Sequence, residues 1–237
     1  MVVPQQKPPA PASESASSST PAAPSGIGAL IKVASSAKMI FFTVIVFLSG
    51  CNGSLIDTFL NVYLNTQGAP GVLMGTARML TCAAEVPFFQ VAPKILKVLG
   101  VSGSIAAAQV AYLLRFLWYV NLKSIAALGP WGYWAVLPIE LLHGLTFAVN
   151  WSAITAHCSR VAPAGMAGST QQLISTVHWG LAAGVGAAVG GRVIARSGGE
   201  RMFMLGAGQA ALTLLLTGVG ASLFGKELLG RGVEAKD

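Results

Sequence analysis

Residues 132–158 read GYWAVLPIELLHGLTFAVNWSAITAHC, and this stretch decides the class of the fold. Its side chains are mainly apolar or small, and Glu140 is its one formally charged residue. An α-helix rises about 1.5 Å per residue, so about 20 apolar residues cross the roughly 30 Å hydrocarbon core of a bilayer. We therefore predict a transmembrane helix at 132–158 that holds an acid at membrane depth.

Five further apolar stretches of similar length lie at about 39–64, 71–92, 101–122, 167–192 and 202–224. The chain has 54% hydrophobic residues, 10% charged residues and a mean hydropathy of +0.66, whereas a soluble domain carries about 25% charged residues. Short segments with turn formers and charges separate the stretches, such as PKILKVLG at 93–100 and ARSGGER at 195–201. We predict an all-α membrane protein with six transmembrane helices over 39–224, in which neighbouring helices run antiparallel.

The two ends of the chain differ in composition from this apolar region. Residues 1–38 contain the segment PPAPASESASSSTPAAPSG, which is rich in proline, alanine and serine. Such a composition offers little apolar surface to bury, so we predict a disordered tail followed by a cytoplasmic lead-in. Residues 225–237 are predicted to form a second cytoplasmic tail.

Lysine and arginine residues between the apolar stretches predict the orientation in the membrane. With the N-terminus in the cytoplasm, nine of them lie on the inner side: Lys7, Lys32, Lys38, Lys94, Lys97, Arg160, Lys226, Arg231 and Lys236. Four lie on the outer side: Lys123, Arg192, Arg196 and Arg201. The positive-inside rule therefore favours both termini in the cytoplasm, with the plasma membrane as the default and an organelle as the alternative. This distribution also explains the net charge of +7, so we expect no nucleic acid partner.

Ionisable side chains inside the predicted helices are the main functional signal. They are Asp57, Arg78, Glu85, Arg115, Glu140, His143 and His178. A charged group at membrane depth costs about 2.5–3.5 kcal/mol by insertion scales unless it is paired or faces water. We therefore predict a polar interior between the helices, which is typical of a path for a solute.

Four of these charged residues are predicted to share one layer. Counting inward from the outer helix ends places them roughly 10 Å below the outer boundary of the membrane. They are Asp57, Arg78, Arg115 and Glu140. Two interpretations stay open: the charges form fixed ion pairs that lock helices together, or one pair, with Asp57 and Arg115 as the candidate, opens when a solute or proton binds.

Polar residues also recur along one stripe of the helix at 132–158. Glu140, His143, Phe147, Asn150 and His157 follow at helical spacing, so we expect the stripe to face a cavity near the middle of the membrane. A carboxylate one turn from an imidazole can hold a proton near neutral pH, so Glu140 and His143 are candidates for proton coupling. His178 on the next helix has two interpretations, a solute contact or a packing residue satisfied by a hydrogen bond.

Small residues and missing motifs complete the sequence evidence. Gly180 and Gly184, and again Gly186 and Gly190, form the G-x-x-x-G pattern, which indicates a packing groove within the bundle or a dimerisation face. The histidines lack metal-site spacing, and the chain has no Walker A or G-x-S-x-G motif. We therefore expect neither an enzyme nor a bound cofactor or metal.

Several motifs resemble one known family. They are EVPFF at 85–89, LRFLWY at 114–119, LPIELLHGLTFAVNWSA at 137–153 and VHWGLAAGVGAAVGG at 177–191. Together they resemble the C-terminal six helices of the major facilitator superfamily, in its associated-domain branch, the group of the major facilitator superfamily domain-containing protein six. The resemblance implies a two-bundle transporter in which the branch's characteristic polar positions are Glu85, Arg115, Glu140, His143 and His178.

Members of this family have twelve transmembrane helices, whereas six are predicted here. We therefore weigh three explanations: a fragment of a longer product, a chain that pairs with a second six-helix half, or a chain that has lost transport. Our main hypothesis is part of a secondary active transporter for a small solute, coupled to protons by symport. The alternative is a non-transporting membrane scaffold or receptor. Expected partners are a small solute, the lipid bilayer and a second six-helix half.

Overall fold

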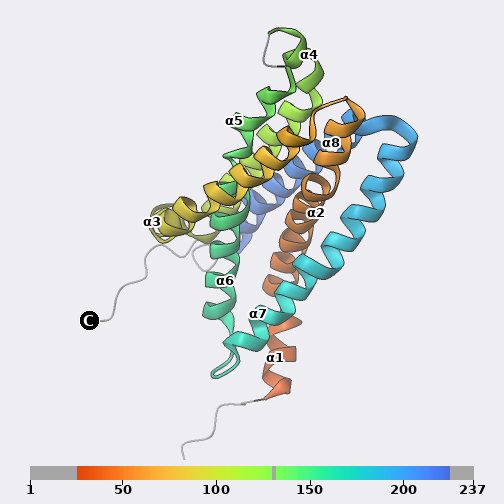
Figure 1. Cartoon of the computed structure of the whole chain (residues 1–237). Coiled ribbons are helices and arrows are strands. Elements are labelled where there is room, and N and C mark those ends of the chain that lie inside the picture. The colour runs from red at the N-terminus through yellow and green to blue at the C-terminus, as the bar shows by residue number, and fades with distance from the viewer. Residues whose placement is uncertain (1–25, 130–131, 225–237) are drawn as a thin grey trace, which may run out of the picture.

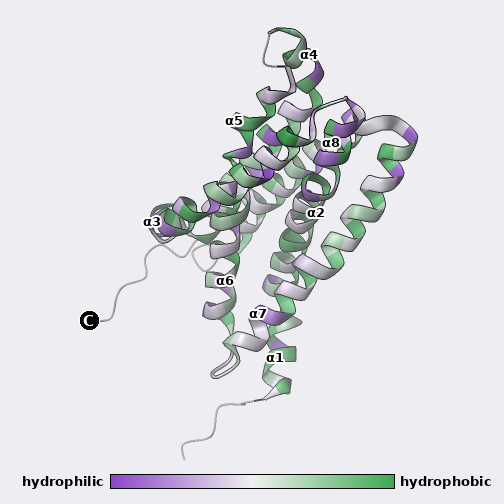
Figure 2. Ribbon diagram, viewed as in Figure 1, coloured by the Kyte–Doolittle hydropathy of each residue, from purple (hydrophilic) through white to green (hydrophobic). Residues whose placement is uncertain are grey.

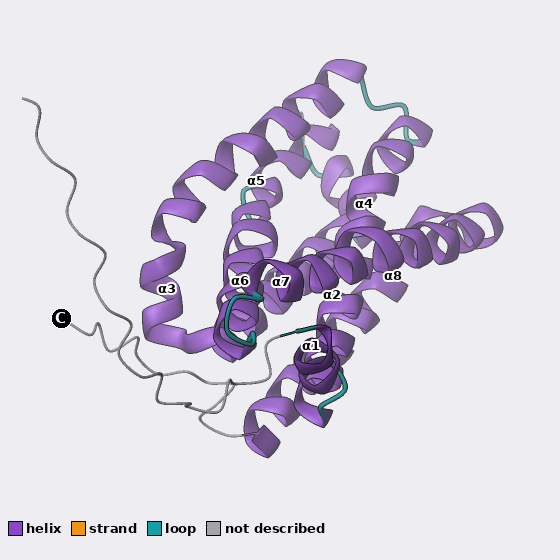
Figure 3. Cartoon of the chain, turned by 90° about the horizontal axis from the view of Figure 1, so that it is seen from below, coloured by secondary structure: helices purple, strands orange, loops and turns teal. Residues whose placement is uncertain are grey.

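The computed structural model describes residues 26–129 and 132–224, and all regular secondary structure in these ranges is helical (Figure 3). The tails predicted at 1–25 and 225–237 lie outside the described residues. Helix α1 (Ile27–Ala34) occupies part of the predicted lead-in. The all-α prediction is confirmed for the part of the chain that the structure describes.

Helix α2 (Ala37–Thr66) is one long apolar helix. It begins at Ser36, whose hydroxyl accepts a hydrogen bond from the Met39 amide at 3.3 Å and so caps one of the free N–H groups at the helix start. It ends at a tight turn in which Gly68 adopts a φ of 76°. This positive φ favours glycine. Pro70 is the N-cap residue of the next helix.

Helix α3 (Gly71–Val120) has 50 residues, which would extend about 75 Å if it were straight. The backbone leaves the helical conformation at Gly100, where φ is 69° and ψ is −176°. Two stretches that were predicted as separate helices, 71–92 and 101–122, therefore lie on the two sides of this kink. Helix α4 (Leu122–Ala127) follows directly.

The stretch Gly132–Val161 combines four short elements in one helical run. They are the 3₁₀-helix η1 (Gly132–Val136), helix α5 (Leu137–Glu140), the π-helix η2 (Gly144–Val149) and helix α6 (Asn150–Val161). Pro138 lies in the first turn of α5, where a missing N–H breaks no helical bond. π-Helical segments are rare and are frequently found at functional sites.

The last helical run, Ala167–Phe224, repeats both features. Helix α7 (Ala167–Ser175) leads into the π-helix η3 (Thr176–Ala182), which continues as helix α8 (Ala183–Phe224). The backbone turns within α8 at Gly198, where φ is 83° and ψ is 168° (Figure 1). The predicted stretches 167–192 and 202–224 lie on the two sides of this turn.

Four helical runs in the described residues are long and apolar enough to cross a membrane: Ala37–Thr66, Gly71–Val120, Gly132–Val161 and Ala167–Phe224. Their exposed side chains include large apolar ones, such as Val86, Leu181 and Leu215. Hydrophobic residues are spread along the length of these helices (Figure 2). An apolar outer surface fits lipid rather than water. The chain is an integral membrane protein.

One end of the bundle is fixed by contacts between distant segments. The Lys123 ammonium lies 2.7 Å from the Glu200 carboxylate, which joins α4 to the turn within α8. A cavity of about 440 Å³ at the same end is lined by residues of both segments and by the C-terminal end of α2. Helix α1 lies at the opposite end of the molecule (Figure 1).

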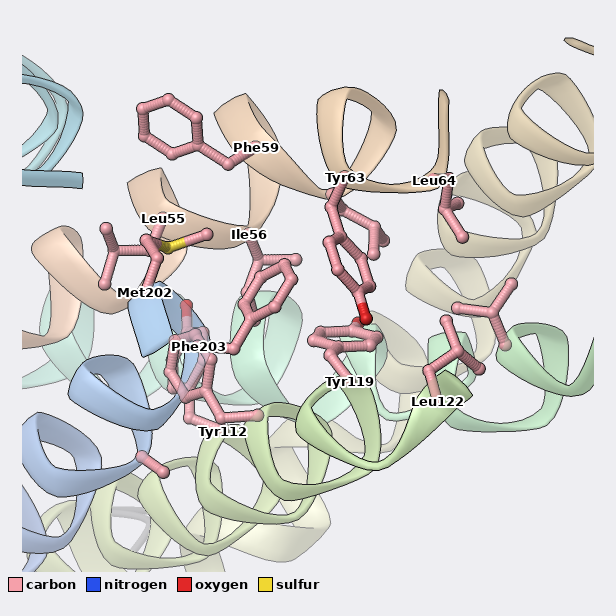
Figure 4. Packing of buried hydrophobic residues seen from close by; sticks show 14 of the residues in the cluster. Leu55, Ile56, Phe59, Tyr63, Leu64, Tyr112, Tyr119, Leu122, Met202 and Phe203 are labelled. Carbon is pink, nitrogen blue, oxygen red and sulfur yellow. The ribbon is translucent and has the colours of Figure 1, made fainter. Parts of the chain in front are cut away.

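The interior is packed around aromatic side chains. Phe203 of α8 lies 5.3 Å from Tyr63 of α2 and 5.1 Å from Tyr119 of α3, measured between ring centroids (Figure 4). A second apolar cluster near the other end contains Phe42 of α2 and Ile154 of α6. These clusters hold α2, α3, α6 and α8 in fixed positions, and a polar centre lies between the helices.

Candidate functional site

Arg115 of α3 is the centre of a buried polar cluster, and its side chain is 2% exposed. Its NH2 group donates to Glu140 Oε2 at 2.9 Å, its Nε to the Tyr119 hydroxyl at 3.0 Å and its NH1 to Thr146 Oγ1 at 3.0 Å. Each of the three guanidinium nitrogens therefore has a protein acceptor. A buried charge needs such complete pairing, because desolvation otherwise outweighs the attraction between two ions.

Glu140 of α5 is held equally firmly. One carboxylate oxygen accepts from Arg115, and the other accepts from the Tyr119 hydroxyl at 2.5 Å. Tyr119 and Arg115 are one turn apart on α3, so donors on one face of that helix bind both carboxylate oxygens of Glu140. The Arg115–Glu140 pair therefore joins α3 to α5 rigidly.

His143 connects this pair to a second acid. Its Nδ1 lies 3.3 Å from Arg115 NH1, and because a guanidinium can only donate, Nδ1 must be the acceptor. The proton of the neutral ring is then on Nε2, which lies 3.0 Å from Glu85 Oε1 and donates to it. Glu85 is 27% exposed, so the chain of contacts runs from the buried pair to a partly exposed acid.

Asp57 and Arg78 form a separate, more open pair. Their closest atoms, Asp57 Oδ1 and Arg78 NH1, are 3.2 Å apart, and the side chains are 41% and 62% exposed. The layer of four charges is thus divided into the pairs Asp57–Arg78 and Arg115–Glu140.

Two pairs of residues that the sequence suggested as acting together have other partners in the structure. Asp57 contacts Arg78 rather than Arg115, because Glu140, Tyr119 and Thr146 already occupy the guanidinium of Arg115. His143 contacts Glu85 rather than Glu140, because both oxygens of Glu140 are already bound.

A cavity of about 140 Å³ adjoins the cluster. It is lined by five of the predicted site residues: Asp57, Arg115, His143, Asn150 and His178. Glu140 lies behind Arg115 and lines a smaller cavity of about 20 Å³ together with Asp57 and Arg78. Glu85 is not among the residues that line either cavity, and it reaches the larger one only through its contact with His143, which does line it. The larger cavity is below the about 300–1,000 Å³ of typical small-molecule sites, so the described residues enclose only a small solute or one side of a larger site.

Aromatic rings form one wall of the larger cavity. Phe147, Trp151 and Trp179 line it, with ring centroids 5.8 Å apart for Phe147–Trp179 and 5.5 Å apart for Trp151–Trp179. His178 contacts this wall at 4.5 Å from the Trp179 ring, and its Nδ1 lies 3.2 Å from the carbonyl oxygen of Val46. His178 therefore both faces the cavity and ties η3 to α2, so its two interpretations are compatible.

Uncharged polar side chains lie beneath the cavity. Gln109 accepts from Asn52 at 3.1 Å and donates to Ser49 at 3.0 Å, and Asn150 donates to the same serine at 2.9 Å. All four are buried. The network fixes the orientation of Asn150, which lines the cavity.

Most of the chain matches the model of one protein family. The model of a family described as "MFS_1 like family" matches residues 2–205, which is most of the chain. The chain belongs to the MFS_1 like family. Its major facilitator assignment, predicted from motifs, is therefore confirmed, and members of this family are typically transporters.

Three relatives of this MFS_1 like chain are each longer than it is. It is 24% identical over 172 residues to "Major facilitator superfamily domain-containing protein 6-like" of Mus musculus, which covers 73% of this chain and 28% of the relative. It is 26% identical over 196 residues to the protein of that name from Danio rerio, covering 80% and 35%. It is 25% identical over 170 residues to "Major facilitator superfamily domain-containing protein 6-like protein B" of Xenopus laevis, covering 72% and 26%.

The chain therefore spans about a quarter to a third of these relatives' length. No solved structure matches the MFS_1 like chain. In the described ranges, no group of three or more histidine, cysteine, aspartate or glutamate residues is placed to hold a metal ion.

Sequence reasoning missed several residues of the site. Trp151 and Trp179 each follow a predicted polar residue directly, and that adjacency was the available signal. Neighbours in an α-helix point about 100° apart, so a stripe drawn at α-helical spacing leaves them out. The π-helix η2 ends two residues before Trp151 and η3 contains Trp179, so α-helical spacing does not hold through these segments. Ser49, Asn52 and Gln109 gave no charge signal at all.

Proposed function

We propose that the chain forms part of a secondary active transporter that carries a small solute through the cavity beside Arg115. The observation that carries the proposal is a cavity lined by ionisable and aromatic side chains inside an apolar helical bundle of the MFS_1 like family. Intramembrane ionisable residues that face a cavity mark solute and proton paths. A locked, non-transporting scaffold is the alternative, and it is favoured only by the complete pairing of Arg115.

We further propose six spans. The kink at Gly100 and the turn at Gly198 each divide a helix that is too long for one crossing of the bilayer. Both positions fall in the charged connecting segments PKILKVLG and ARSGGER. Six crossings place both termini on one side, and the lysine and arginine counts support the cytoplasm for that side, with the plasma membrane as the default location.

A second six-helix half is proposed to complete the cavity, because alternating access requires two bundles around one central site. An antibody against the segment RGVEAKD at 231–237 tests this on denatured and crosslinked membrane extracts. We expect a denatured band near twice the 24.3 kDa of this chain, or a band at 24.3 kDa that crosslinks to a species of twice that size. A 24.3 kDa band that never crosslinks would contradict the second half and favour the scaffold.

Coupling to protons is proposed to occur at Glu85 and His143. A proton that adds to the neutral His143 ring must occupy Nδ1, which faces the Arg115 guanidinium at 3.3 Å. Two donors cannot share that contact, so protonation of His143 would push Arg115 away from the ring. A proton on Glu85 would instead weaken its bond to His143 Nε2. Either event links proton binding to the position of groups that line the cavity.

This coupling predicts a charge movement when the pH changes. In proteoliposomes of the full chain adsorbed on a solid-supported membrane, a pH jump should give a transient current as Glu85 and His143 bind or release a proton. Glu85→Gln should reduce that current at least tenfold, and Cys82→Ser, at an exposed position three residues earlier on α3, should leave it unchanged. A folded wild-type chain without any current would overturn the transport proposal in favour of the scaffold.

A further inference from the structure

We propose that the cavity recognises organic cations, that is, a protonated or quaternary amine attached to an apolar body. The inference rests on the proposed function only in taking this cavity as the solute site. Two independent features carry it. One is the excess of acidic over basic side chains in the cluster beside the cavity. The other is the row of aromatic side chains next to the Glu85 carboxylate.

The charges around the cavity do not cancel. The clustered acids in the described residues are Asp57, Glu85 and Glu140, and the clustered guanidinium groups are Arg78 and Arg115. Arg78 pairs with Asp57 at 3.2 Å and Arg115 with Glu140 at 2.9 Å. Glu85 contacts the imidazole of His143, and the Arg115 contact on Nδ1 keeps that imidazole neutral. Glu85 is thus the surplus negative charge.

An anion finds no comparable partner here. The three nitrogens of the Arg115 guanidinium already donate to Glu140, Tyr119 and Thr146. A carboxylate or phosphate ligand would have to displace Glu140 from a buried pair, leaving that acid unpaired at membrane depth. Arg78 is the more exposed base, and it is engaged with Asp57. The charge pattern therefore favours a ligand of positive charge.

Aromatic rings continue from Glu85 along the same face. Phe89 lies one turn beyond Glu85 on α3, and its ring centroid is 5.6 Å from that of Phe147 in an edge-to-face arrangement. Phe147 in turn contacts Trp179 at 5.8 Å. Phe89 is 40% exposed and Trp179 is 49% exposed, and Trp179, unlike Phe89, lines the cavity. Trp151 extends the same wall.

A carboxylate beside exposed aromatic faces is the arrangement that binds organic cations. The ring quadrupole attracts the positive charge, tryptophan most strongly, and the rings cover the apolar body of the ligand. Glu85 supplies the counter-ion at 27% side-chain exposure, where contact with water weakens but does not remove the attraction. A neutral molecule of the same shape would gain only the ring contacts. The site therefore distinguishes ligands by charge.

The test compares two probes of matched shape, 2-phenylethylamine, which is protonated at pH 7, and neutral 2-phenylethanol. Tryptophan fluorescence of the purified full chain in nanodiscs reports binding, because Trp151 and Trp179 line the cavity. We expect the amine to bind at least tenfold more tightly than the alcohol. Glu85→Gln should bring the two affinities within about twofold, whereas Glu85→Asp, which keeps the charge, and the exposed control Cys82→Ser should preserve the preference. Trp179→Leu should weaken both probes.

Equal affinity of the two probes in the wild-type chain would overturn the proposal, and so would a preference that survives in a folded Glu85→Gln chain. The outcome is separate from that of the transport test. A preference for the amine without any current on a pH jump would support the cation site and contradict the transport proposal. A current without a preference for the amine would support the transport proposal and contradict the cation site.

Discussion

Replacing Glu140 with alanine should destabilise the protein by about 3–5 kcal/mol, because it leaves the Arg115 guanidinium buried without its counter-ion. Arg115 is 2% exposed and cannot turn to water, and its NH2 group would lose the acceptor that it now contacts at 2.9 Å. The Tyr119 hydroxyl would lose its acceptor in the same change. Denaturant titration of the purified full chain in detergent, followed by tryptophan fluorescence, measures the loss.

The double variant Arg115→Met with Glu140→Leu separates the cost of an unpaired charge from the value of the pair. Buried ion pairs can often be replaced by apolar residues of similar volume at little cost, so we expect the double variant to recover most of the lost stability. Asp57→Asn is the matched control at the open pair, where 41% exposure predicts an effect of about 1 kcal/mol or less. An undisturbed Glu140→Ala chain would show that the Arg115–Glu140 pair does not hold the bundle together.

That these four charges lie near one another could be predicted from the sequence, but their partners could not. Counting residues from helix ends placed Asp57, Arg78, Arg115 and Glu140 in one layer, and the structure pairs all four. Partner choice depends on how each helix is rotated about its axis, which residue spacing alone leaves undetermined. For Glu140 the competing partners were Arg115, Tyr119 and His143, and Arg115 and Tyr119 occupy its two oxygens.

Chain direction changes were predictable because they depend on local chemistry. Gly100 and Gly198 both adopt positive φ values, which glycine tolerates, and both lie in connecting segments that the sequence had marked by charges. Helical structure resumes directly on each side of the two glycines, so a kink rather than a longer loop joins the helices there. Positions in the site were less predictable: the amide network of Asn52 and Gln109 is visible only once α2 and α3 are packed together.

Close packing between α2 and η3 leads to the second large effect. A Cβ atom on Gly50 would lie 2.7 Å from the Ala182 Cβ and 2.8 Å from the carbonyl oxygen of His178. One of these atoms belongs to the backbone, so no side chain can rotate away to make room. Cys51 and Ser54 also donate to the carbonyl oxygens of Ala182 and Ala183 across this contact, at 3.4 and 2.8 Å.

Gly50→Ala should therefore destabilise the protein by about 1–3 kcal/mol and Gly50→Val by more, because either change pushes η3 away from α2. Gly184→Ala is the matched control from the G-x-x-x-G pattern at 180 and 184: nothing lies within 4 Å of its added Cβ, and alanine favours a helix by up to about 1 kcal/mol over glycine. The same denaturant titration measures both. Each of the two changes adds one methyl group. A loss of stability for Gly50→Ala with a gain for Gly184→Ala would therefore locate the packing groove at α2. A Gly50→Ala chain as stable as the wild type would contradict the close approach of α2 and η3.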